Sequence, residues 1–370
     1  MKIMALDLGK NKTAVCEFTV ASSDVRHVSV KTRRAEIEGL LDRLRPDRVV
    51  MEVGPIAGWV SDLARERGLD VEVANPSTEG WRWRNVKKKT DRLDALKLAR
   101  LSAMGQLPQV HMPSPAVRQW RSLIGYRDHL VGRRSAIKHR IRDILLRQGL
   151  TLPGGKKAWT QKGLAALSAV SADWADCGEE LWRGELFTEL KALGQAMELV
   201  AEVQEKLDAL GEADERVKLL RTMDGVGPRL AEAVVATLDD PHRFGNGRQV
   251  GSIAGLAPRG YQSGQSQRMG RISKAGSGLL RKLLIQVSWL GLRNNAWMRE
   301  TYQRIHRGIK TRKKIAIVAV ARRLLVVLWA MMRDGQRWRR PQPPAASSEP
   351  EQRRGLQAVR EFLGCQAAPR

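Results

Sequence analysis

The sequence predicts a mixed α/β domain at its amino-terminal end and mainly helical regions beyond it. Short apolar runs that are typical of strands lie at residues 1–8, 12–20, 49–53 and 71–74. Helical patterns at 34–44 and 57–66 alternate with the later strands, which favours parallel pairing within one sheet. From residue 116 onward, apolar residues recur mostly at helical spacing.

The first elements carry local signals for where they begin and end. The turn Gly9-Lys10-Asn11 separates the first two strands, and Val25–Val30 is a candidate third strand. Thr90 can cap a helix that begins at Asp91. Three prolines at positions 108, 113 and 115 then mark a linker.

Two long helices of opposite charge are predicted in the middle of the chain, a basic one at 116–148 and an acidic one at 185–210. Such a pair favours an antiparallel hairpin or coiled coil. Further helices follow at 277–293 and 313–332. We therefore expect a sheet domain at 1–110, a helical-hairpin region at 111–215, a mainly helical domain at 216–335, and a disordered tail at 336–370 with a short helix near 356–363.

The charge of the chain indicates a polyanionic partner. Lysine and arginine number 65 against 39 acids, which gives a net charge of +26. Residues 81–147 hold 17 cations and 4 acids, and residues 221–340 hold 24 and 6, whereas residues 151–220 hold 8 and 13. Nucleic acid is the simplest partner for the two basic blocks.

Composition also argues against zinc and against a membrane. Cys16, Cys177 and Cys365 form no C-x-x-C pair, and the chain opens on a strand-like run rather than a secretory signal, which fits a reduced cytoplasm. Residues 315–332 are apolar enough for a membrane helix. Arg322 and Arg323 lie in its middle, however, so a buried helix of a folded domain is expected.

Four acids are candidates for a metal site. Asp7 and Glu52 end predicted strands, and Asp91 and Asp94 are neighbours on one helical face. Carboxyl ends of adjacent strands converge at a sheet edge, and carboxylates without His or Cys suit Mg²⁺ or Mn²⁺. Asp7 could instead be a turn residue, and Asp91 could pair with Lys87 or Lys88. Glu52, flanked by Met and Val, is harder to explain structurally, because an unpaired buried carboxylate is costly.

The motifs around these acids resemble the DEDD transposases of insertion sequences, the family that includes the Piv-type invertases. They read A-L-D-L-G-K, then M-E-V-G-P, then K-T-D-R-L-D-A. The resemblance covers about residues 1–335. It implies an RNase-H-like, RuvC-type nuclease domain whose catalytic, metal-binding tetrad is Asp7, Glu52, Asp91 and Asp94.

A second signature lies at residues 255–277, G-L-A-P-R-G-Y-Q-S-G-Q-S-Q-R-M-G-R-I-S-K-A-G-S. It is dense in Gly, Ser and Arg and holds no acid, so it predicts a phosphate-holding loop with Arg259, Arg268, Arg271 and Lys274. The same family carries this pattern, and the resemblance makes Ser263 the catalytic nucleophile. Without it, Ser263 would be interpreted as a phosphate ligand or a turn cap.

A glycine-containing turn precedes that signature. The stretch D-G-V-G-P at 224–228 resembles a helix-hairpin-helix turn, in which Gly225 and Gly227 let backbone N–H groups approach a DNA phosphate. An ordinary tight connection between two helices remains the alternative.

The resemblance implies a recombinase with a covalent phosphoserine intermediate. It implies donor and target DNA as substrates, a bridge RNA that pairs with both, and sites shared between subunits of a dimer or tetramer. The hairpin at 111–215 is then a candidate dimer element. The residues that could hold nucleic acid beside the tetrad are Trp81, Arg82, Trp83, Arg84, Lys87, Lys88 and Lys89. A bacterial cytoplasmic enzyme at the nucleoid is expected.

Three other functions remain open on the sequence alone. A metal-dependent, junction-resolvase-like nuclease would use the tetrad with water and leave Ser263 idle. A nucleic-acid-binding protein without activity would need no intact tetrad. A DNA-reading invertase would use the same chemistry without a guide RNA.

Overall fold

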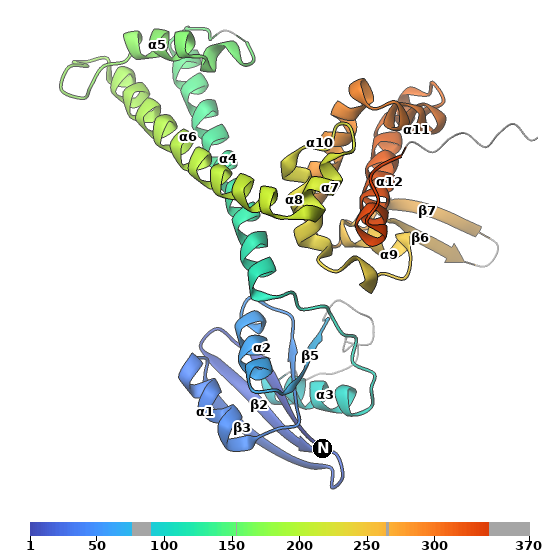
Figure 1. Ribbon diagram of the computed structural model, residues 1–370. Coiled ribbons are helices and arrows are strands. Elements are labelled where there is room, and N and C mark those ends of the chain that lie inside the picture. Colours follow the sequence, from blue (N-terminus) through green and yellow to red (C-terminus); the bar gives the residue numbers. More distant parts are fainter. Residues whose placement is uncertain (76–89, 153, 264–265, 340–370) are drawn as a thin grey trace, which may run out of the picture. The chain divides into compact units, whose positions relative to one another are not determined.

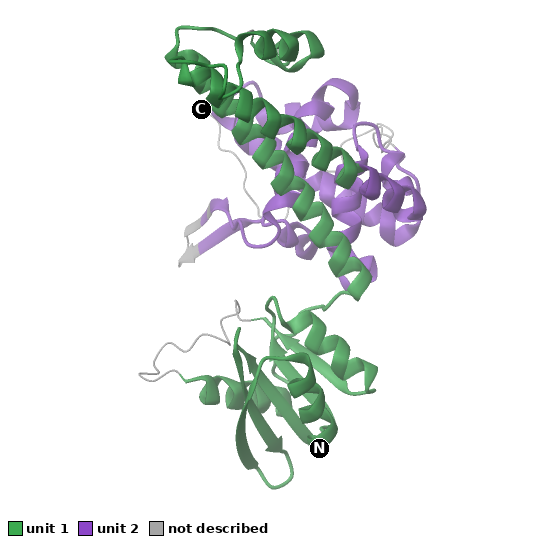
Figure 2. Cartoon of the chain, turned by 90° about the vertical axis from the view of Figure 1, so that its left-hand side faces the viewer, with its two compact units in different colours: residues 1–204 green, residues 205–370 purple. Residues whose placement is uncertain are grey.

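The computed structural model describes residues 1–75, 90–152, 154–263 and 266–339. These form two compact units, residues 1–204 and residues 205–370, which Figure 2 shows in separate colours. The expected short helix at 356–363 lies outside the described residues.

Unit 1 begins with the predicted mixed sheet. Its five strands are arranged in the order β3-β2-β1-β4-β5 (Figure 1). The first three strands pair antiparallel, and β1, β4 and β5 pair parallel. Their bounds are β1 Lys2–Leu8, β2 Lys12–Thr19, β3 Asp24–Lys31, β4 Arg48–Glu52 and β5 Asp70–Ala74.

Helices cover both faces of this sheet. On one face, α1 (Arg34–Leu44) and α2 (Ala57–Glu66) bury an apolar cluster that includes Met4 and Leu6. On the other face, α3 (Asp91–Ala103) packs on β1, β2 and β4, in a cluster that includes Ile3 and Ala5. The alternation of side chains along β1 therefore divides the core into two layers.

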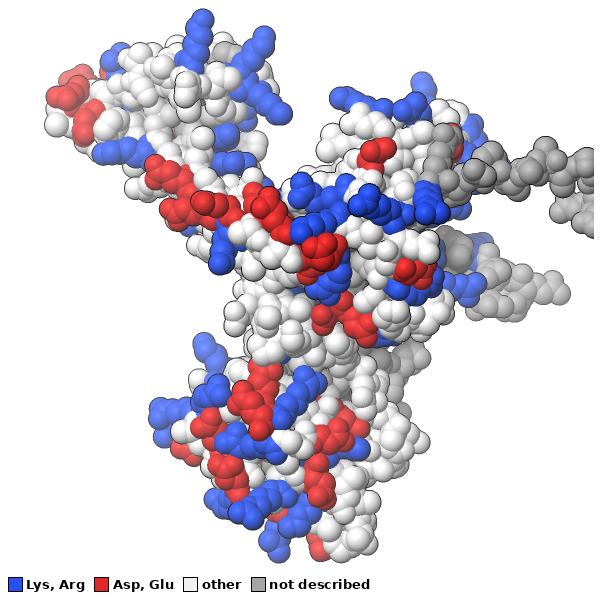
Figure 3. Space-filling view, in the orientation of Figure 1, with Lys and Arg blue, Asp and Glu red and all other residues white. Residues whose placement is uncertain are grey.

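The predicted antiparallel hairpin of charged helices follows, α4 (Pro115–Arg147) and α6 (Leu181–Ala213). It belongs to unit 1 except for the last turns of α6, which lie beyond Gln204 in unit 2. Arg147 pairs with Glu185 at 3.2 Å near one end, and Arg127 donates to Gln204 at 3.0 Å farther along. In Figure 3, acidic side chains follow α6. The short 3-10 helix η2 (Lys157–Trp159) and α5 (Gln161–Val170) lie between the two helices in sequence.

Two boundaries in this hairpin differ from the prediction. Pro115, expected in a linker, is the first residue of α4, where its missing N–H costs no hydrogen bond, and Ser114 caps the helix. The acidic helix begins at Leu181 rather than at residue 185.

Unit 2 is mainly helical, as predicted. Its central element is α12 (Lys313–Asp334), which packs against α7, α8, α9, α10 and α11. Their bounds are α7 Glu215–Arg221, α8 Pro228–Leu238, α9 Gly247–Ile253, α10 Gly278–Asn294 and α11 Ala296–His306, with 3-10 turns η3 Pro241–Arg243 and η4 Lys310–Arg312.

Helix α12 contains the apolar segment that could be mistaken for a membrane helix. The stretch Lys310–Asp334 is long and apolar enough to cross a bilayer, and 56% of its most apolar window is buried inside the protein. Its buried residues, such as Val320 and Leu324, form the core of unit 2. The prediction of a core helix is confirmed.

The stretch 255–277, expected to be a loop, is largely a β-hairpin. Strands β6 (Pro258–Ser263) and β7 (Ser266–Ile272) pair antiparallel and form a sheet of their own (Figure 1). Glycine is depleted in strands and the stretch has few β-branched or aromatic residues, so its composition does not indicate a β-hairpin. Most of the second signature, residues 255–277, therefore lies on the two strands of this hairpin.

Candidate active site

Asp7 and Glu52 lie next to each other at the carboxyl ends of two parallel strands. In the β1–β4 ladder Leu6 pairs with Met51, so the next residues along each strand are Asp7 and Glu52. Both side chains are partly exposed, whereas Leu6 and Met51 are fully buried. Two neighbouring carboxylates therefore reach the surface of the domain at this edge of the sheet.

Side-chain alternation places both acids on the face that α3 covers. Ile3 and Ala5 of β1 and Val50 of β4 share one apolar cluster with Ala95 and Leu98 of α3. Asp7 is two residues beyond Ala5, and Glu52 is two residues beyond Val50. Because residues two apart on a strand share a face, the two acids belong to the α3 side of the sheet.

The carboxyl-terminal end of α3 is fixed at the opposite end of the strands. Ser102 Oγ donates to Glu72 Oε2 at 2.6 Å, and Arg48 Nη1 lies 3.3 Å from Ser102 Oγ. Arg48 also pairs with Glu72 Oε1 at 3.1 Å, and the Gln109 side chain donates to the same Oε1 at 2.9 Å. Because Arg48 begins β4, this buried network holds the end of α3 where that strand starts.

The first turn of α3 therefore lies toward Asp7 and Glu52. The eight residues from Asp94 to Ser102 span about 12 Å of helix, and the four from Arg48 to Glu52 span about 13 Å of strand. Thr90 caps α3, as predicted, by accepting from the Leu93 N–H. Asp94 is 9% exposed and Asp91 is exposed.

The structure thus brings all four predicted acids to one edge of the sheet. The positive end of the α3 dipole favours the carboxylates of its first turn. In the described part of the chain, no three His, Cys, Asp or Glu side chains stand close enough to share one ion. The donors are carboxylate oxygens, the chemistry that Mg²⁺ and Mn²⁺ prefer, so the set fits such an ion in kind, although its members are not gathered around one position.

Sequence reasoning missed the residues that orient α3. Glu72 is 8% exposed and Ser102 is 2% exposed, yet neither was singled out. The available signal was a charged residue in the middle of the short apolar strand V-E-V, since a buried carboxylate requires partners.

The basic and aromatic residues predicted beside the tetrad lie outside the described residues. These are Trp81, Arg82, Trp83, Arg84, Lys87, Lys88 and Lys89. Their role as a nucleic-acid contact stays a prediction.

Ser263 is the last residue of β6, where the hairpin turns. Its register partner on β7 is Ser266, and its side chain is not among those the structure describes. Two residues earlier, Tyr261 pairs with Arg268, so these two exposed side chains are cross-strand neighbours. Ser263 therefore lies on the same projecting hairpin as Arg259, Arg268 and Arg271.

Two glycines of the second signature close the base of this hairpin. Gly255 has φ +63° and Gly276 has φ +95°. A Cβ on Gly276 would collide with the Ile253 carbonyl oxygen, and one on Gly255 with that of Ala275. Ser277 donates its N–H to Ile253 at 3.0 Å across the same junction. These glycines serve a close backbone crossing, a role that sequence reasoning missed.

The remaining predicted cations lie at or near this base. Arg259 donates to the Ser273 carbonyl at 3.3 Å, and Lys274 adopts a left-handed φ of +55°. Together with Tyr261 and Arg271 they line a cavity of about 430 Å³.

The glycine turn at 224–228 joins α7 to α8 in unit 2. Gly225 has φ +90° and a Cβ there would lie 3.7 Å from the Gly291 Cα of α10. The Asp224 carbonyl accepts from Asn295 at 2.8 Å. Gly225 and Gly227 are both exposed. These contacts account for the turn as a helix connection, and a phosphate contact stays a prediction.

Comparisons with known proteins cover both regions. A DEDD transposase family of the IS110 type matches residues 4–148, and the family described as "Transposase IS116/IS110/IS902 family" matches residues 217–303. The first match contains the four acids and the second contains Ser263.

Several relatives match along most of their length. A "Probable family 20 transposase" of Pseudomonas aeruginosa is 30% identical over 342 residues, covering 89% of this chain and 96% of that protein. The "Transposase for insertion sequence element IS1111A" of Coxiella burnetii is 27% identical and covers 92% of each chain. A "Pilin gene-inverting protein" of Moraxella bovis is 24% identical and covers 68% of each.

Among solved structures, "T. thermophilus RuvC in complex with Holliday junction substrate" is 17% identical. It covers 30% of this chain and 99% of that one, with a TM-score of 0.23.

Proposed function

The chain belongs to the IS110-type DEDD transposases, enzymes that cut and join DNA, and from this premise we propose that it moves an insertion sequence through two chemical centres. One centre is the acid edge of unit 1. The other is Ser263 on the hairpin of unit 2. The observation that carries the proposal is that Asp7, Glu52, Asp91 and Asp94 share one sheet edge, although 84 residues separate the first from Asp91.

The acid edge would hold Mg²⁺ or Mn²⁺ through carboxylates of the tetrad. When bound, such an ion neutralises charge on the scissile phosphate. The protein's own part is positional. The Glu72–Ser102–Arg48 network holds one end of α3, which leaves the other end, with Asp91 and Asp94, toward the edge that carries Asp7 and Glu52.

Ser263 supplies the nucleophile in this scheme. Its Oγ attacks the scissile phosphorus, a serine–phosphate ester bond forms, and the bond from phosphorus to the leaving deoxyribose oxygen breaks. The serine proton is lost and the leaving oxygen gains one. A strand-end hydroxyl then reverses the step on the other partner, so that the number of phosphodiester bonds is conserved. Arg259, Arg268 and Arg271, on the same hairpin, would steady the phosphate.

Donor and target DNA are the substrates of this reaction. We propose in addition that a bridge RNA selects both sites, held by the basic stretch 81–147. The hairpin of α4 and α6 would join subunits, so that Ser263 of one copy can meet the acids of another. The reaction would take place at the nucleoid in the bacterial cytoplasm.

A trapping assay tests the two-centre scheme. The full chain, purified with its RNA, is given nicked, labelled donor DNA and Mg²⁺, and denatured samples are searched for protein–DNA adducts. We expect an adduct in the wild type and none in Ser263→Ala. Cleavage without an adduct that survives Ser263→Ala and requires Asp7 would instead establish a metal-dependent nuclease.

A further inference from the structure

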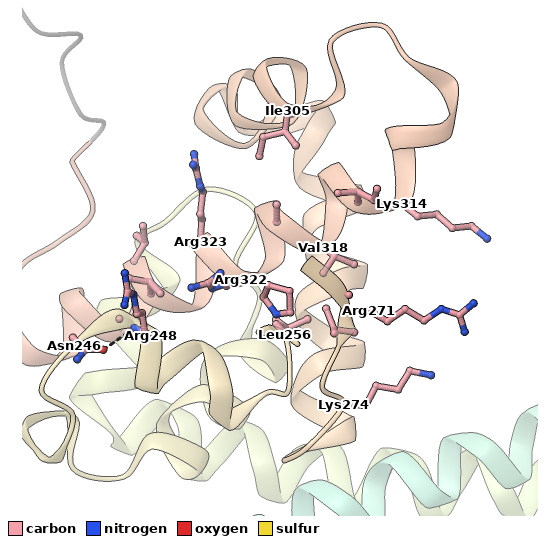
Figure 4. A pocket seen from close by; sticks show the side chains of 18 of the residues that line it. Asn246, Arg248, Leu256, Arg271, Lys274, Ile305, Lys314, Val318, Arg322 and Arg323 are labelled. Atoms are coloured by element: carbon pink, nitrogen blue, oxygen red, sulfur yellow. Dashed lines mark hydrogen bonds between the residues drawn. The ribbon is translucent and has the colours of Figure 1, made fainter. Parts of the chain in front are cut away.

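Unit 2 contains a large groove that the proposed chemistry does not use. Its volume is about 1180 Å³, and it lies between the base of the β6–β7 hairpin, α9 and α12 (Figure 4). The hairpin contributes Pro258, Arg271 and Ile272 to its wall. The groove therefore adjoins the scaffold that carries Ser263, within one compact unit.

The floor of the groove is the second face of α12. Helix positions three and four apart form one stripe, and the lining residues of α12 follow that spacing. The opposite face, with Val320 and Leu324, is buried in the helical core, whereas Ile315 on the groove side is 64% exposed. The apolar members of the groove stripe are Ile315, Val318, Ala319, Val326 and Val327.

The rim of the groove is cationic. Six of its described lining residues are lysine or arginine and none is acidic. Arg271, Lys274 and Lys314 extend in one direction in Figure 4, away from Arg248, Arg322 and Arg323. Within the described ranges, none of these six side chains forms an ion pair with an acid.

Two of these cations are crowded. Burial lowers the pKa of the Arg323 guanidinium, and the charges of Arg304 and Arg322 lower that pKa further. The Arg322 stem packs over Gly251, where a Cβ would lie 3.0 Å from its Nε. An anion bound between these groups would relieve their repulsion.

The lining favours an unpaired DNA strand over other occupants. A duplex presents phosphates but keeps its bases stacked, so it would leave the apolar floor empty. The tail at 340–370 has five arginines and three glutamates and is thus of the same sign as the rim. Among the described lining residues only Asn246 has a side-chain hydrogen-bond acceptor, so the proton of a ribose 2′-hydroxyl would find few side-chain partners there.

We propose that this groove binds unpaired nucleotides of the DNA strand being cut, with bases on the α12 stripe and phosphates on the rim. Trp297 lines the groove and meets Trp338 edge to face, with ring centroids 5.3 Å apart, so this pair adds aromatic surface against which a base could pack. The proposal rests on the proposed function in that it names the form of DNA that the Ser263 unit holds. Strand exchange requires such unpaired ends.

Equilibrium binding tests the groove apart from the chemistry. Fluorescence anisotropy of the full-length protein, freed of RNA and held in EDTA, is followed with labelled single-stranded DNA, its duplex and single-stranded RNA of the same sequence. We expect single-stranded DNA to bind tighter than its duplex. Single-stranded RNA can also bind the basic stretch 81–147, so its affinity should not fall in the groove variants described below. Because no cleavage takes place, this result does not depend on whether Ser263 forms an adduct.

The charge variant is Arg322→Gln with Arg323→Gln. We expect about tenfold weaker binding of single-stranded DNA, and a slope of log affinity against log salt that is smaller by about 1.4, or about 0.7 for each lost phosphate contact. Arg221→Gln, on an exposed position of α7 that does not line the groove, is the matched control and should bind as the wild type does.

The apolar variant is Val318→Gln, which keeps every charge. We expect about tenfold weaker binding of single-stranded DNA with an unchanged salt slope and unchanged duplex binding. Leu290→Gln, at a 63% exposed position of α10, is the control. Thermal unfolding of each variant verifies that it is folded.

Photocrosslinking of the unaltered protein avoids the risk of misfolded variants. Single-stranded DNA carrying 4-thiothymine should crosslink to peptides of α12 and to the one that contains Trp297. Crosslinks confined to other peptides would overturn the proposal, as would wild-type binding of single-stranded DNA by both the charge variant and Val318→Gln. A Val318→Gln protein that binds DNA normally but loses self-association would make the groove a protein interface instead.

Discussion

The acid edge of unit 1 and the hairpin of unit 2 solve opposite electrostatic problems. At the acid edge, β1 and β4 place Asp7 beside Glu52, and the first turn of α3, with Asp91 and Asp94, lies toward the same edge. The repulsion between these carboxylates falls when a cation binds. At the hairpin base and groove, cations gather without acids. The repulsion between these cations falls when a phosphate binds.

The difference in charge between the acid edge and the cationic hairpin suggests that units 1 and 2 carry out different parts of the reaction. The acid edge is precise because a sheet register and a buried network fix it. The hairpin is a two-stranded projection, fixed mainly at its base by Gly255 and Gly276. We interpret unit 1 as the centre that activates a phosphate and unit 2 as the element that grips the strand and supplies the nucleophile.

The largest effect should come from Asp7→Asn. Removing one carboxylate from a preorganised charged site should slow strand cleavage on the order of 10³-fold. Gel assays of cleaved donor DNA would measure this loss. The control Glu36→Gln changes an exposed acid in the first turn of α1 and should leave the rate unchanged.

Single-stranded DNA binding in EDTA should be the same for Asp7→Asn and the wild type. Loss of binding along with cleavage would contradict the division between the two units, because it would make the acid edge part of the strand grip.

Gly276→Ala should disrupt the base of the β6–β7 hairpin in unit 2. The substitution places a side chain at φ +95° and against the Ile253 carbonyl, which should lower the free energy of unfolding by about 3 kcal/mol. Gly278→Ala, where the nearest neighbour is an arginine nitrogen at 3.6 Å, is the matched control.

Hydrogen exchange would localise the damage of Gly276→Ala. We expect faster exchange in β6, β7 and α10, with unit 1 unchanged. Equally faster exchange in the five-stranded sheet of unit 1 would show that the two units do not fold independently.

A smaller effect is expected at the network that orients α3. Ser102→Ala removes the donor to Glu72 and should cost about 1 kcal/mol of stability, together with about a tenfold loss of cleavage. Ser135→Ala, whose hydroxyl bonds within α4, should do neither. A cleavage loss without any change in the metal dependence of the rate would argue against a positioning role.

The smallest effect concerns Cys16, buried beneath α3. Burial raises the pKa of its thiol to about 11 from 9.0, and the Arg100 charge opposes that rise. The folded chain then holds a proton that the unfolded chain loses, so the Cys16 contribution to stability should fall as the pH rises from about 9 to about 11. Denaturant unfolding of wild type and Cys16→Ala across this range would measure it.

At neutral pH, native Cys16 should resist alkylation, because the reactive thiolate is absent and the side chain is fully buried. Rapid labelling of Cys16 in the folded protein would show that α3 opens from the sheet.

The acid edge could be predicted from the sequence to a large extent. Asp7 and Glu52 follow short continuous apolar runs that are typical of buried strands, and Thr90 marks where α3 begins. Parallel pairing then brings the strand ends together. The orientation of α3 could not be foreseen, since it depends on Glu72, Ser102 and Arg48, which meet only in three dimensions.

The hairpin was much harder to predict. Its strands consist largely of Gly, Ser, Gln and Arg, and their sequence shows no alternation of apolar and polar residues with a period of two. Family resemblance, not physical chemistry, identified Ser263. The groove was hidden for another reason: an apolar stripe on each side of α12 predicts burial on both, and only the structure shows which one is covered.

The most direct test of the account is to locate the atom that joins protein to DNA. The trapped adduct would be digested and the nucleotide-bearing peptide sequenced by mass spectrometry. We predict that the nucleotide is attached to Ser263, at the end of β6. Tyr261, two residues earlier, is 60% exposed and also carries a hydroxyl. Attachment of the nucleotide to Tyr261 or to any residue of unit 1 would contradict the assignment of Ser263 as the nucleophile.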